Sequence, residues 1–269
     1  MPASPRAHLE TFGFVVLRDI TDSSALSAEF DATMQEAFSD ASPMISGSAG
    51  NEFHYVPMMS DRTPVSLGLV VRLSVLAAEL LGGPVLPGRA KGTRYRGSTV
   101  WHRDSEMPVR SLGFAFYFEP LGATDGALQV LPGSHAPEFA AAVRAYAAHA
   151  TDLPGVAVPT APGDAIVFDE RLYHASAGGG LRRQWRVDFV TDMPAQDDAL
   201  REYFARQYSP DWDGGYDVER FPSYGAHWRT LNARWNERLD ELGAYGAAAA
   251  EEAFMRARQR EAVERPQAG

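Results

Sequence analysis

Short apolar segments separated by turn signals run from residue 85 to residue 191 and limit this chain to folds built mainly from β-strands. Turn sequences such as Pro162-Gly163-Asp164 divide the segments, and one predicted helix at about 136–149 interrupts them. Strands with this spacing are typical of a double-stranded β-helix, the jelly-roll barrel also found in cupins. The candidate strands are 85–89, 94–101, 111–119, 127–131, 156–159, 165–168 and 184–191.

Helices are predicted on both sides of this region, so the expected fold class is mainly β with flanking helices. Residues 24–38 and 64–81 carry apolar side chains at helical spacing. Beyond residue 192 the chain becomes aromatic and helical, and it ends in an alanine-rich helix at about 227–262. We therefore expect a core at about 12–191, which includes a short strand at 12–17, followed by a helical C-terminal extension at about 192–269.

The stretch 41–62 has no hydrophobic period and is rich in Ser, Gly, Pro, Asn and Met. It is long for a connection without secondary structure, which favours either a functional lid or a disordered segment. Its Phe53, His54 and Tyr55 suit a lid over an apolar pocket. A partly packed surface loop explains the same composition.

Composition narrows the functional classes. The chain has 269 residues and 45% hydrophobic content, which fits a single domain over 1–269. Its formal charge of −10 argues against nucleic acid or an anionic membrane as a partner. There is no cysteine, so thiolate metal sites, thiol nucleophiles and disulfides are excluded. Because no signal peptide or spanning segment is visible, we expect a cytoplasmic protein, monomeric or homodimeric, with a small-molecule substrate.

A possible metal site begins with His102 and Asp104, which are separated by one residue. On a strand these two side chains would point to the same face. His174, further along the chain, would add a second imidazole. Two histidines and one carboxylate on one face of a metal leave the opposite positions open, which is typical of non-haem Fe(II) oxygenases. A histidine and an aspartate at this spacing are common by chance, so the neighbouring motifs determine how much weight the pair carries.

Those motifs resemble one enzyme family. Residues 125–135, DGALQVLPGSH, resemble its signature G-x-L-x-x-x-P-G-S-H. Residues 162–168, PGDAIVF, lead into YHAS at 173–176 and are similar to its second-histidine segment, while GFVVL at 13–17 resembles its first strand. Together these phrases cover roughly residues 12–191, and they resemble the phytanoyl-CoA dioxygenase-like (PhyH) branch of the Fe(II)/2-oxoglutarate oxygenases.

The resemblance implies that His102, Asp104 and His174 are the catalytic iron ligands, with Fe(II), 2-oxoglutarate and O2 as cofactor and cosubstrates. In this family 2-oxoglutarate chelates the iron through its 1-carboxylate and keto oxygen. An aspartate at the third ligand also separates hydroxylases from the related halogenases, in which chloride takes that position. Hydroxylation is therefore the expected outcome, although desaturation, ring closure and epoxidation use the same iron ligands.

The family's distal-carboxylate site is less clear in this sequence. Relatives pair the far carboxylate of 2-oxoglutarate with an arginine about eleven residues after the second histidine, where this chain has Trp185. Arg186 and Arg183 are the nearest candidates, and a planar guanidinium suits a carboxylate. We favour Arg186, with Arg186 and Asp188 facing inward and Trp185 facing outward. Lys91, the only lysine in the chain, could supply a second charge, and a solvated lysine at a strand entrance is the alternative.

The expected function is hydroxylation of a C–H bond in a small metabolite, for example in natural-product biosynthesis. Arg94 and Arg96 could form a basic patch beside the pocket that binds an anionic substrate, or they could simply be solvated. Two other classes remain open. One is a cupin-type metalloenzyme that does not use 2-oxoglutarate, and the other is a non-catalytic jelly-roll binding protein. Iron and 2-oxoglutarate binding would separate these classes from an oxygenase.

Overall fold

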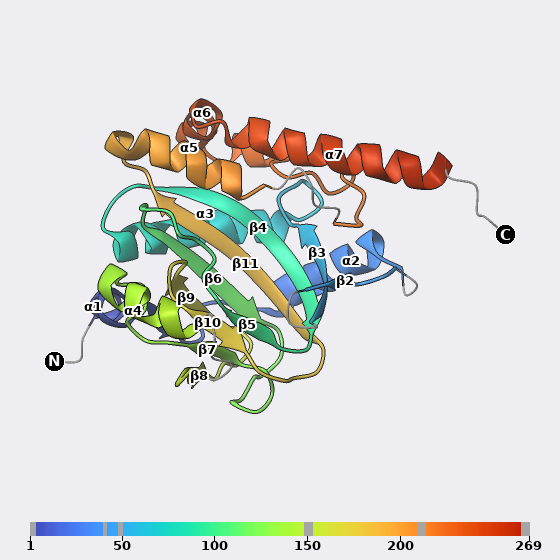
Figure 1. The fold of residues 1–269 in the computed structure, drawn as a ribbon. Coiled ribbons are helices and arrows are strands. Elements are labelled where there is room, and N and C mark those ends of the chain that lie inside the picture. The colour runs from blue at the N-terminus through green and yellow to red at the C-terminus, as the bar shows by residue number, and fades with distance from the viewer. Residues whose placement is uncertain (1–3, 40–41, 48–50, 148–152, 209–213, 265–269) are drawn as a thin grey trace.

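The computed structural model describes residues 4–39, 42–47, 51–147, 153–208 and 214–264. Two antiparallel sheets with flanking helices form its centre (Figure 1). The larger sheet has the strand order β1 (Phe14–Leu17), β9 (Ala165–Asp169), β6 (Ser111–Tyr117), β11 (Arg182–Thr191), β4 (Val85–Arg96), β3 (Glu52–Pro57) and β2 (Ile45–Ser46). The smaller sheet has the order β5 (Thr99–His102), β10 (His174–Ser176), β7 (Leu128–Val130) and β8 (Val156–Val158).

From β4 onward the chain crosses repeatedly between the two sheets, as in a jelly roll, and the sheets do not close into one continuous barrel. The helices are α1 (Pro5–Phe12), α2 (Ser24–Ala37), α3 (Pro64–Leu81), α4 (Pro137–Ala147), α5 (Asp197–Arg206), α6 (Ala233–Glu241) and α7 (Ala244–Glu264), with short 3-10 turns at Pro194–Gln196 and Trp228–Thr230. Figure 1 shows α5, α6 and α7 lying together along one side of the sheets. The predicted fold class is confirmed by this arrangement.

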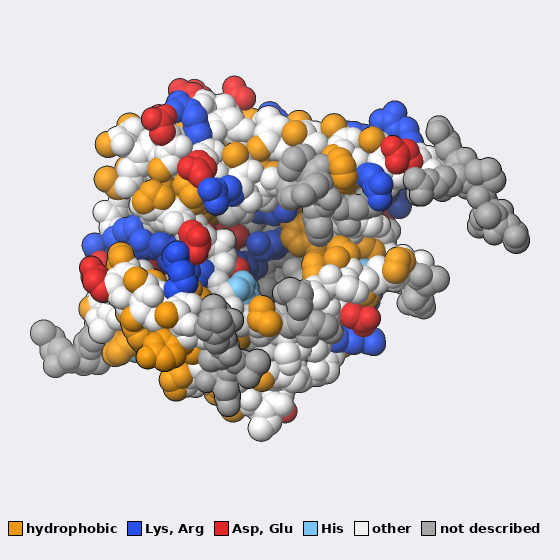
Figure 2. Space-filling model, in the orientation of Figure 1, with side chains coloured by type: hydrophobic (Ala, Val, Ile, Leu, Met, Phe, Trp, Pro, Cys, Tyr) orange, Lys and Arg blue, Asp and Glu red, His pale blue; other side chains and the backbone are white. Residues whose placement is uncertain are grey.

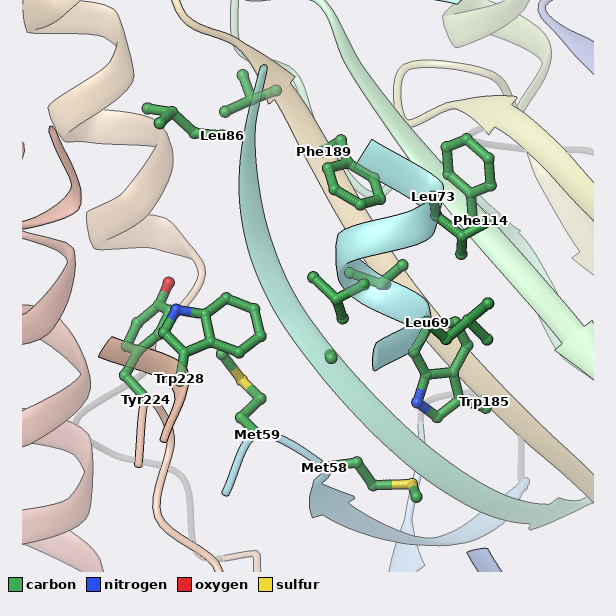
Figure 3. Close-up of a cluster of buried hydrophobic side chains, with 14 of the residues drawn as sticks. Met58, Met59, Leu69, Leu73, Leu86, Phe114, Trp185, Phe189, Tyr224 and Trp228 are labelled. Atoms are coloured by element: carbon green, nitrogen blue, oxygen red, sulfur yellow. The ribbon is translucent and has the colours of Figure 1, made fainter. Parts of the chain in front are cut away.

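The main core lies between the large sheet and α3. Side chains on β11 alternate, so that Trp185, Val187 and Phe189 are fully buried in this core while Arg186 lies on the pocket side. Figure 3 shows Trp185 and Phe189 packed beside the helix. The indole Nε1 of Trp185 donates a hydrogen bond of 2.8 Å to Ser66 Oγ on α3. This contact helps to fix the register that turns Arg186 toward the pocket.

Among the described residues, α3 alone is long and apolar enough to cross a membrane by length and composition. Its side chains Leu67, Val70, Leu73 and Ala77 are buried in the core against the large sheet. The helix is therefore accounted for as the core helix of this fold.

Several boundaries differ from the sequence prediction. The second half of 41–62 is not a free loop, because 52–57 forms β3 and pairs with β4, while 40–41 and 48–50 lie outside the described residues. The predicted strands 85–89 and 94–101 are replaced by one long strand, β4, and the shorter β5. The predicted helix at about 227–262 divides near Gly243, whose positive φ of 77° ends the turn between α6 and α7.

Candidate active site

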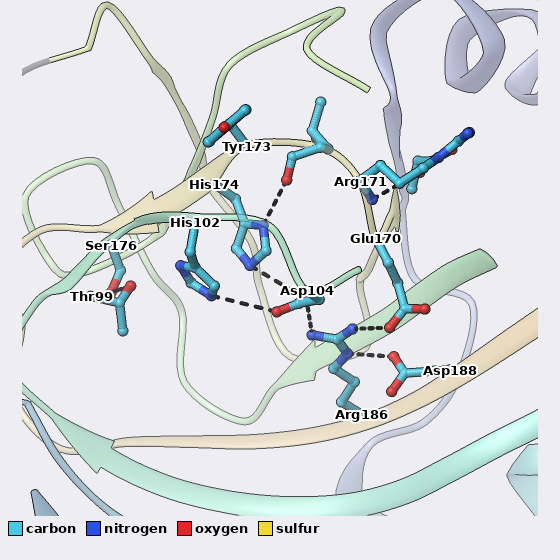
Figure 4. A network of polar contacts seen from close by, with 12 residues as sticks. Thr99, His102, Asp104, Glu170, Arg171, Tyr173, His174, Ser176, Arg186 and Asp188 are labelled. Atoms are coloured by element: carbon cyan, nitrogen blue, oxygen red, sulfur yellow. Dashed lines mark hydrogen bonds and ion pairs between the residues drawn. The ribbon is translucent and has the colours of Figure 1, made fainter. Parts of the chain in front are cut away.

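The three predicted metal ligands meet where β5 and β10 pair. His174 at the start of β10 lies opposite His102 at the end of β5. Asp104 Oδ1 is 3.4 Å from His102 Nε2, and Asp104 Oδ2 is 3.5 Å from His174 Nε2. One ligand atom from each residue lies within 4.8 Å of the others (Figure 4). Asp104 was predicted to lie on the same strand as His102. However, β5 ends at His102, and Asp104 reaches the site from the following bend.

Backbone hydrogen bonds hold these groups in the orientation that a metal needs. His102 Nδ1 lies 2.8 Å from the carbonyl oxygen of Val100, and His174 Nδ1 lies 2.9 Å from that of Leu172. With Nδ1 donating to a carbonyl, each Nε2 keeps its lone pair for a ligand. The backbone N–H of Asp104 donates to the carbonyl of Glu170 at 2.9 Å, which anchors the bend. The residues present therefore fit a ferrous ion held by two imidazoles and one carboxylate.

Electrostatics favour the metal-binding protonation states of His174 and Asp104, but not that of His102. Burial lowers the pKa of His174 to about 4, so this imidazole is neutral at pH 7. Burial alone would raise the pKa of Asp104, but Arg186 and the two histidines hold that pKa well below its usual range. Burial would also lower the pKa of His102, but the hydrogen bond and charge of Asp104 raise it above its ordinary value. An ionised aspartate beside a neutral histidine is ready to bind a cation without losing protons.

Arg186 lies at the centre of a buried acidic cluster behind Asp104. Its Nη1 is 2.6 Å from Asp104 Oδ2, its Nη2 is 3.0 Å from Glu170 Oε1, and its Nε is 2.6 Å from Asp188 Oδ1. Figure 4 shows the three carboxylates arranged around the guanidinium. The guanidinium carbon also lies 4.9 Å from the centre of the Phe168 ring. Arg186 therefore orients the carboxylate of the candidate metal ligand Asp104 through a charge-assisted hydrogen bond.

Sequence reasoning did not identify Glu170 and Tyr203 as site residues. The hydroxyl of Tyr203 on α5 donates to Glu170 Oε2 at 2.8 Å. Burial raises the pKa of Glu170 to about 7, and the nearby charge of Asp188 adds to this effect. An acidic residue directly after the buried strand 165–169 was a signal for Glu170. Nothing in the local sequence indicated Tyr203, because its role depends on how the C-terminal region packs.

The other two cations predicted to bind 2-oxoglutarate, Lys91 and Arg183, lie in different places: one lines the cavity and the other does not. Lys91 lines the pocket, and its Nζ lies 3.3 Å from Asp188 Oδ2. Arg183 is not one of the described pocket residues, because it faces the opposite side of the sheet and pairs with Glu119 at 2.5 Å and Asp31 at 2.6 Å. Arg183 therefore belongs to an ion-pair cluster outside the cavity.

A cavity of about 340 Å³ opens in front of the triad, between the two sheets. In Figure 2 this face is hollowed at its centre, and histidine and basic surfaces are visible in the hollow. Strands of both sheets line it, and aromatic rings lie beside hydroxyl and amide groups. The uncharged lining residues are Asn51, Phe53, Tyr55, Thr93, Tyr95, Thr99, Tyr117, Leu128, Phe168, Ser176 and Gln184.

Two possibilities that the sequence left open are not found at the pocket mouth, although Phe53 and Tyr55 do line the cavity. Strand alternation turns Lys91 to the pocket and Arg94 to the other face of β4, where Arg94 Nη2 lies 2.8 Å from His54 Nδ1. Arg96 follows the same alternation as Arg94 and is exposed. His54 is stacked on Phe38 with ring centres 4.2 Å apart and does not line the cavity. The predicted basic patch therefore does not form beside the site.

Solved structures with the same fold were found for about 70% of this chain. EvdMO1 gives a TM-score of 0.55 at 23% identity, and the match covers only 50% of that protein. The epimerase SnoN, solved with Fe3+, alpha-ketoglutarate and nogalamycin RO, gives 0.56 at 17% identity and covers 70% of this chain and 82% of SnoN. EctD from S. alaskensis, solved with 2-oxoglutarate and 5-hydroxyectoine, gives 0.53 at 24% identity and covers 71% and 76%. These likenesses establish the fold.

A search of curated proteins gave no match. The family comparison did, because phytanoyl-CoA dioxygenase (PhyH) matches residues 9–183, which include all three triad residues and most of both sheets. Ferrous iron and 2-oxoglutarate, the cofactor and cosubstrate expected from the sequence, agree with this match and with the triad geometry. The chain belongs to the phytanoyl-CoA dioxygenase family.

Proposed function

We propose that this protein is an Fe(II)- and 2-oxoglutarate-dependent oxygenase that hydroxylates a C–H bond of a small metabolite. The observation that carries the proposal is the meeting of His102, Asp104 and His174 at the wall of a cavity, with their ligand atoms within 4.8 Å of one another. Three protein ligands on one side of the ion leave positions for a chelating cosubstrate and O2. The triad residues are accordingly proposed as the metal ligands.

The bound cofactor and cosubstrate would supply O2 activation and removal of a hydrogen atom from the substrate, and the protein would supply position and environment. His102 and His174 would hold the metal through Nε2, with their rings fixed by backbone carbonyls. Arg186 would keep Asp104 turned toward the ion. Phe168, whose ring lies 5.0 Å from that of His174, would help to exclude water from the metal side of the cavity.

The pocket lining indicates what kind of substrate would enter. Hydroxyl and amide groups of Thr93, Thr99, Tyr117, Ser176 and Gln184 face the same cavity as the aromatic rings. Such a wall suits a small polar metabolite that can form several neutral hydrogen bonds. EvdMO1 and SnoN have similar folds, and SnoN is described as an enzyme of nogalamycin biosynthesis, which supports a role in natural-product metabolism.

The reaction outcome is part of the proposal, because SnoN shares the fold and is an epimerase. Hydroxylation adds an oxygen atom to the product, whereas epimerisation leaves its mass unchanged. We also propose a cytoplasmic location and a monomer or homodimer with no nucleic-acid or membrane partner. These points follow from composition, family and fold rather than from the site.

Turnover of 2-oxoglutarate to succinate across a panel of polar metabolites tests the proposed function. We expect succinate with Fe(II) present, a product heavier by one oxygen atom, and loss of activity by at least about 100-fold in His174→Ala, since one ligand is removed. His227→Ala is the matched control, because His227 is exposed and far from the triad in sequence. Equal activity in His174→Ala and the wild type would refute the proposal.

A further inference from the structure

The pocket contains two cations among the described residues, and their surroundings differ. Arg186 has a side chain that is 10% exposed, and all three of its nitrogens already contact carboxylates at 2.6 to 3.0 Å. Lys91 lies directly opposite Arg186 in the β4–β11 register. Its side chain is 21% exposed, and its ion-pair contact with Asp188 is longer at 3.3 Å.

A carboxylate that enters the pocket would bind less readily to Arg186 than to Lys91. To pair with Arg186 it would have to compete with Asp104, Glu170 and Asp188, which are held in place by the fold. Breaking a buried charge pair and leaving one partner uncompensated is strongly unfavourable. An ammonium group has three N–H donors, and the contact with Asp188 uses one of them. Lys91 can therefore donate to a second carboxylate while it keeps its contact with Asp188.

The surroundings of Lys91 also suit such a ligand. Thr93 lies two residues along the same face of β4 and lines the same cavity. Tyr95 OH donates to Tyr117 OH at 3.1 Å, and the side chains of Tyr117 and Gln184 line the same cavity, where they offer neutral hydrogen-bonding groups to a ligand. Neutral donors of this kind complete the hydrogen bonds of a bound carboxylate but add no charge. Among the described lining residues, the positive charge that remains for an anion is therefore on Lys91.

We propose that Lys91 binds the distal carboxylate of 2-oxoglutarate, while Arg186 is a positioning residue that holds the metal ligand Asp104. This inference rests on the proposed function, since it assumes that 2-oxoglutarate occupies this cavity. It assigns to a lysine on β4 the contact that the sequence argument favoured for Arg186. A compact ammonium group would hold the carboxylate as a point charge, without the bidentate geometry of a guanidinium.

Calorimetry of the protein loaded with Mn(II) tests the assignment without turnover. The probes are 2-oxoglutarate and 2-oxopentanoate, which carries a methyl group in place of the distal carboxylate. We expect Lys91→Met to weaken 2-oxoglutarate binding by roughly 10- to 100-fold, as for the loss of one charge-assisted hydrogen bond, and to leave 2-oxopentanoate binding within about twofold. Lys91→Arg should recover part of the loss. Arg96→Met is the matched control, because it removes an exposed cation from the same strand.

Each other outcome has a defined meaning. Unchanged 2-oxoglutarate affinity in Lys91→Met overturns the assignment, as does an equal loss for both probes, which would indicate damage to the pocket. A variant that binds 2-oxoglutarate normally but loses affinity for the substrate assigns the cation to the substrate and also overturns it. If the wild-type protein itself does not bind 2-oxoglutarate, the proposed function fails instead.

The single lysine allows a second measurement on the unmodified protein. Amine-selective acylation followed by mass spectrometry of the peptide that contains residue 91 reports on Lys91 alone, because the α-amino group lies on another peptide. With Mn(II) present, 2-oxoglutarate should protect Lys91 from acylation and 2-oxopentanoate should not. Equal protection by the two acids, or none by either, would contradict the contact even if Lys91→Met failed to fold.

Discussion

At Arg186, one side chain joins the proposed metal ligand Asp104 to two other buried carboxylates. Without a metal, three acidic groups share the charge of Arg186 and, through Asp188, that of Lys91. The raised pKa of Glu170 reflects this excess of negative charge together with burial. A divalent cation beside Asp104 would add positive charge to a cluster that lacks it, so metal binding and the acidic cluster should stabilise each other.

Replacing Arg186 tests this coupling. Arg186→Gln would leave buried carboxylates without their partner, so we expect a loss of about 3–5 kcal/mol in unfolding free energy in the metal-free protein. Arg186→Lys keeps the charge but cannot reach three carboxylates, so its unfolding free energy should lie between those of the wild type and Arg186→Gln. Urea unfolding with and without Mn(II) measures both effects. A variant as stable as the wild type, with unchanged Mn(II) affinity, would show that the cluster does not position Asp104.

The candidate site residues that could be predicted from the sequence are those that lie in local motifs. His102, Asp104 and His174 stood in recognisable phrases, and the inward register of Arg186 followed from strand alternation. Glu170 and Tyr203 could not be predicted together as site residues. Glu170 directly follows β9 and Tyr203 lies on α5, so the two meet only through tertiary packing. Whether Lys91 and Arg186 serve 2-oxoglutarate depends on which carboxylates surround them, and spacing does not contain that information.

At the scale of elements, β4 shows why strand boundaries were missed. The predicted strand 85–89 contained Pro87 and Gly88 but ended before Ala90, whereas the chain continues as one strand from Val85 to Arg96. The register with β11 shifts here, so that two residues of β4 lie opposite Asp188 alone. A bulge of this kind accommodates a proline within a sheet and redirects the side chains beyond it. It lies next to the Lys91 and Asp188 contact, and so it helps to aim Lys91 into the pocket.

The helix α3 was predicted with its observed bounds, but its N-terminal cap comes from another element. Glu29 on α2 accepts hydrogen bonds from the backbone N–H groups of Val65 and Ser66 at 2.7 and 2.8 Å. These are two of the first N–H groups that a helix leaves without partners. Sequence patterns describe caps supplied by neighbouring residues, and this one lies 36 residues away from Val65.

Removing this cap should be measurable. We expect Glu29→Ala to lower the unfolding free energy by about 0.5–2 kcal/mol, with Glu29→Gln losing less because its amide oxygen can still accept. Burial raises the pKa of Glu29 above its ordinary value of 4.5. The folded state therefore binds the proton more tightly, so this group's contribution to stability should decline as pH rises from 4.5 through the folded-state pKa. Glu29→Gln should lack that decline in urea unfolding at a series of pH values, and a persistent decline would assign it to another group.

At the scale of the molecule, the C-terminal helices are tied to the site by buried polar contacts. Tyr203 on α5 reaches Glu170, which lies behind the proposed metal ligands. Arg89 on β4 pairs with Glu251 on α7 at 2.7 Å, with the two side chains 8% and 1% exposed. The guanidinium of Arg89 also lies 4.1 Å from the centre of the Tyr208 ring. The region after residue 192, predicted as an extension, thus packs against the strands that carry the pocket.

This packing has a consequence for the fold as a whole. The family match ends at residue 183, before the last part of β11 and before α5, α6 and α7. Arg186 and Tyr203, two residues that organise the acidic cluster, lie beyond that limit. The jelly roll could be predicted from the sequence because its turns and motifs are local. The way in which the later helices complete the site could not, because it depends on contacts between distant segments.

Anaerobic calorimetric titration with Fe(II) and then with 2-oxoglutarate measures whether the triad holds iron and whether the cosubstrate needs that iron. We expect one Fe(II) site per chain, binding of 2-oxoglutarate only after the iron, and loss of both in His102→Ala and His174→Ala but not in His227→Ala. A protein that binds neither ligand, or that binds both equally well without His102 and His174, would contradict this expectation.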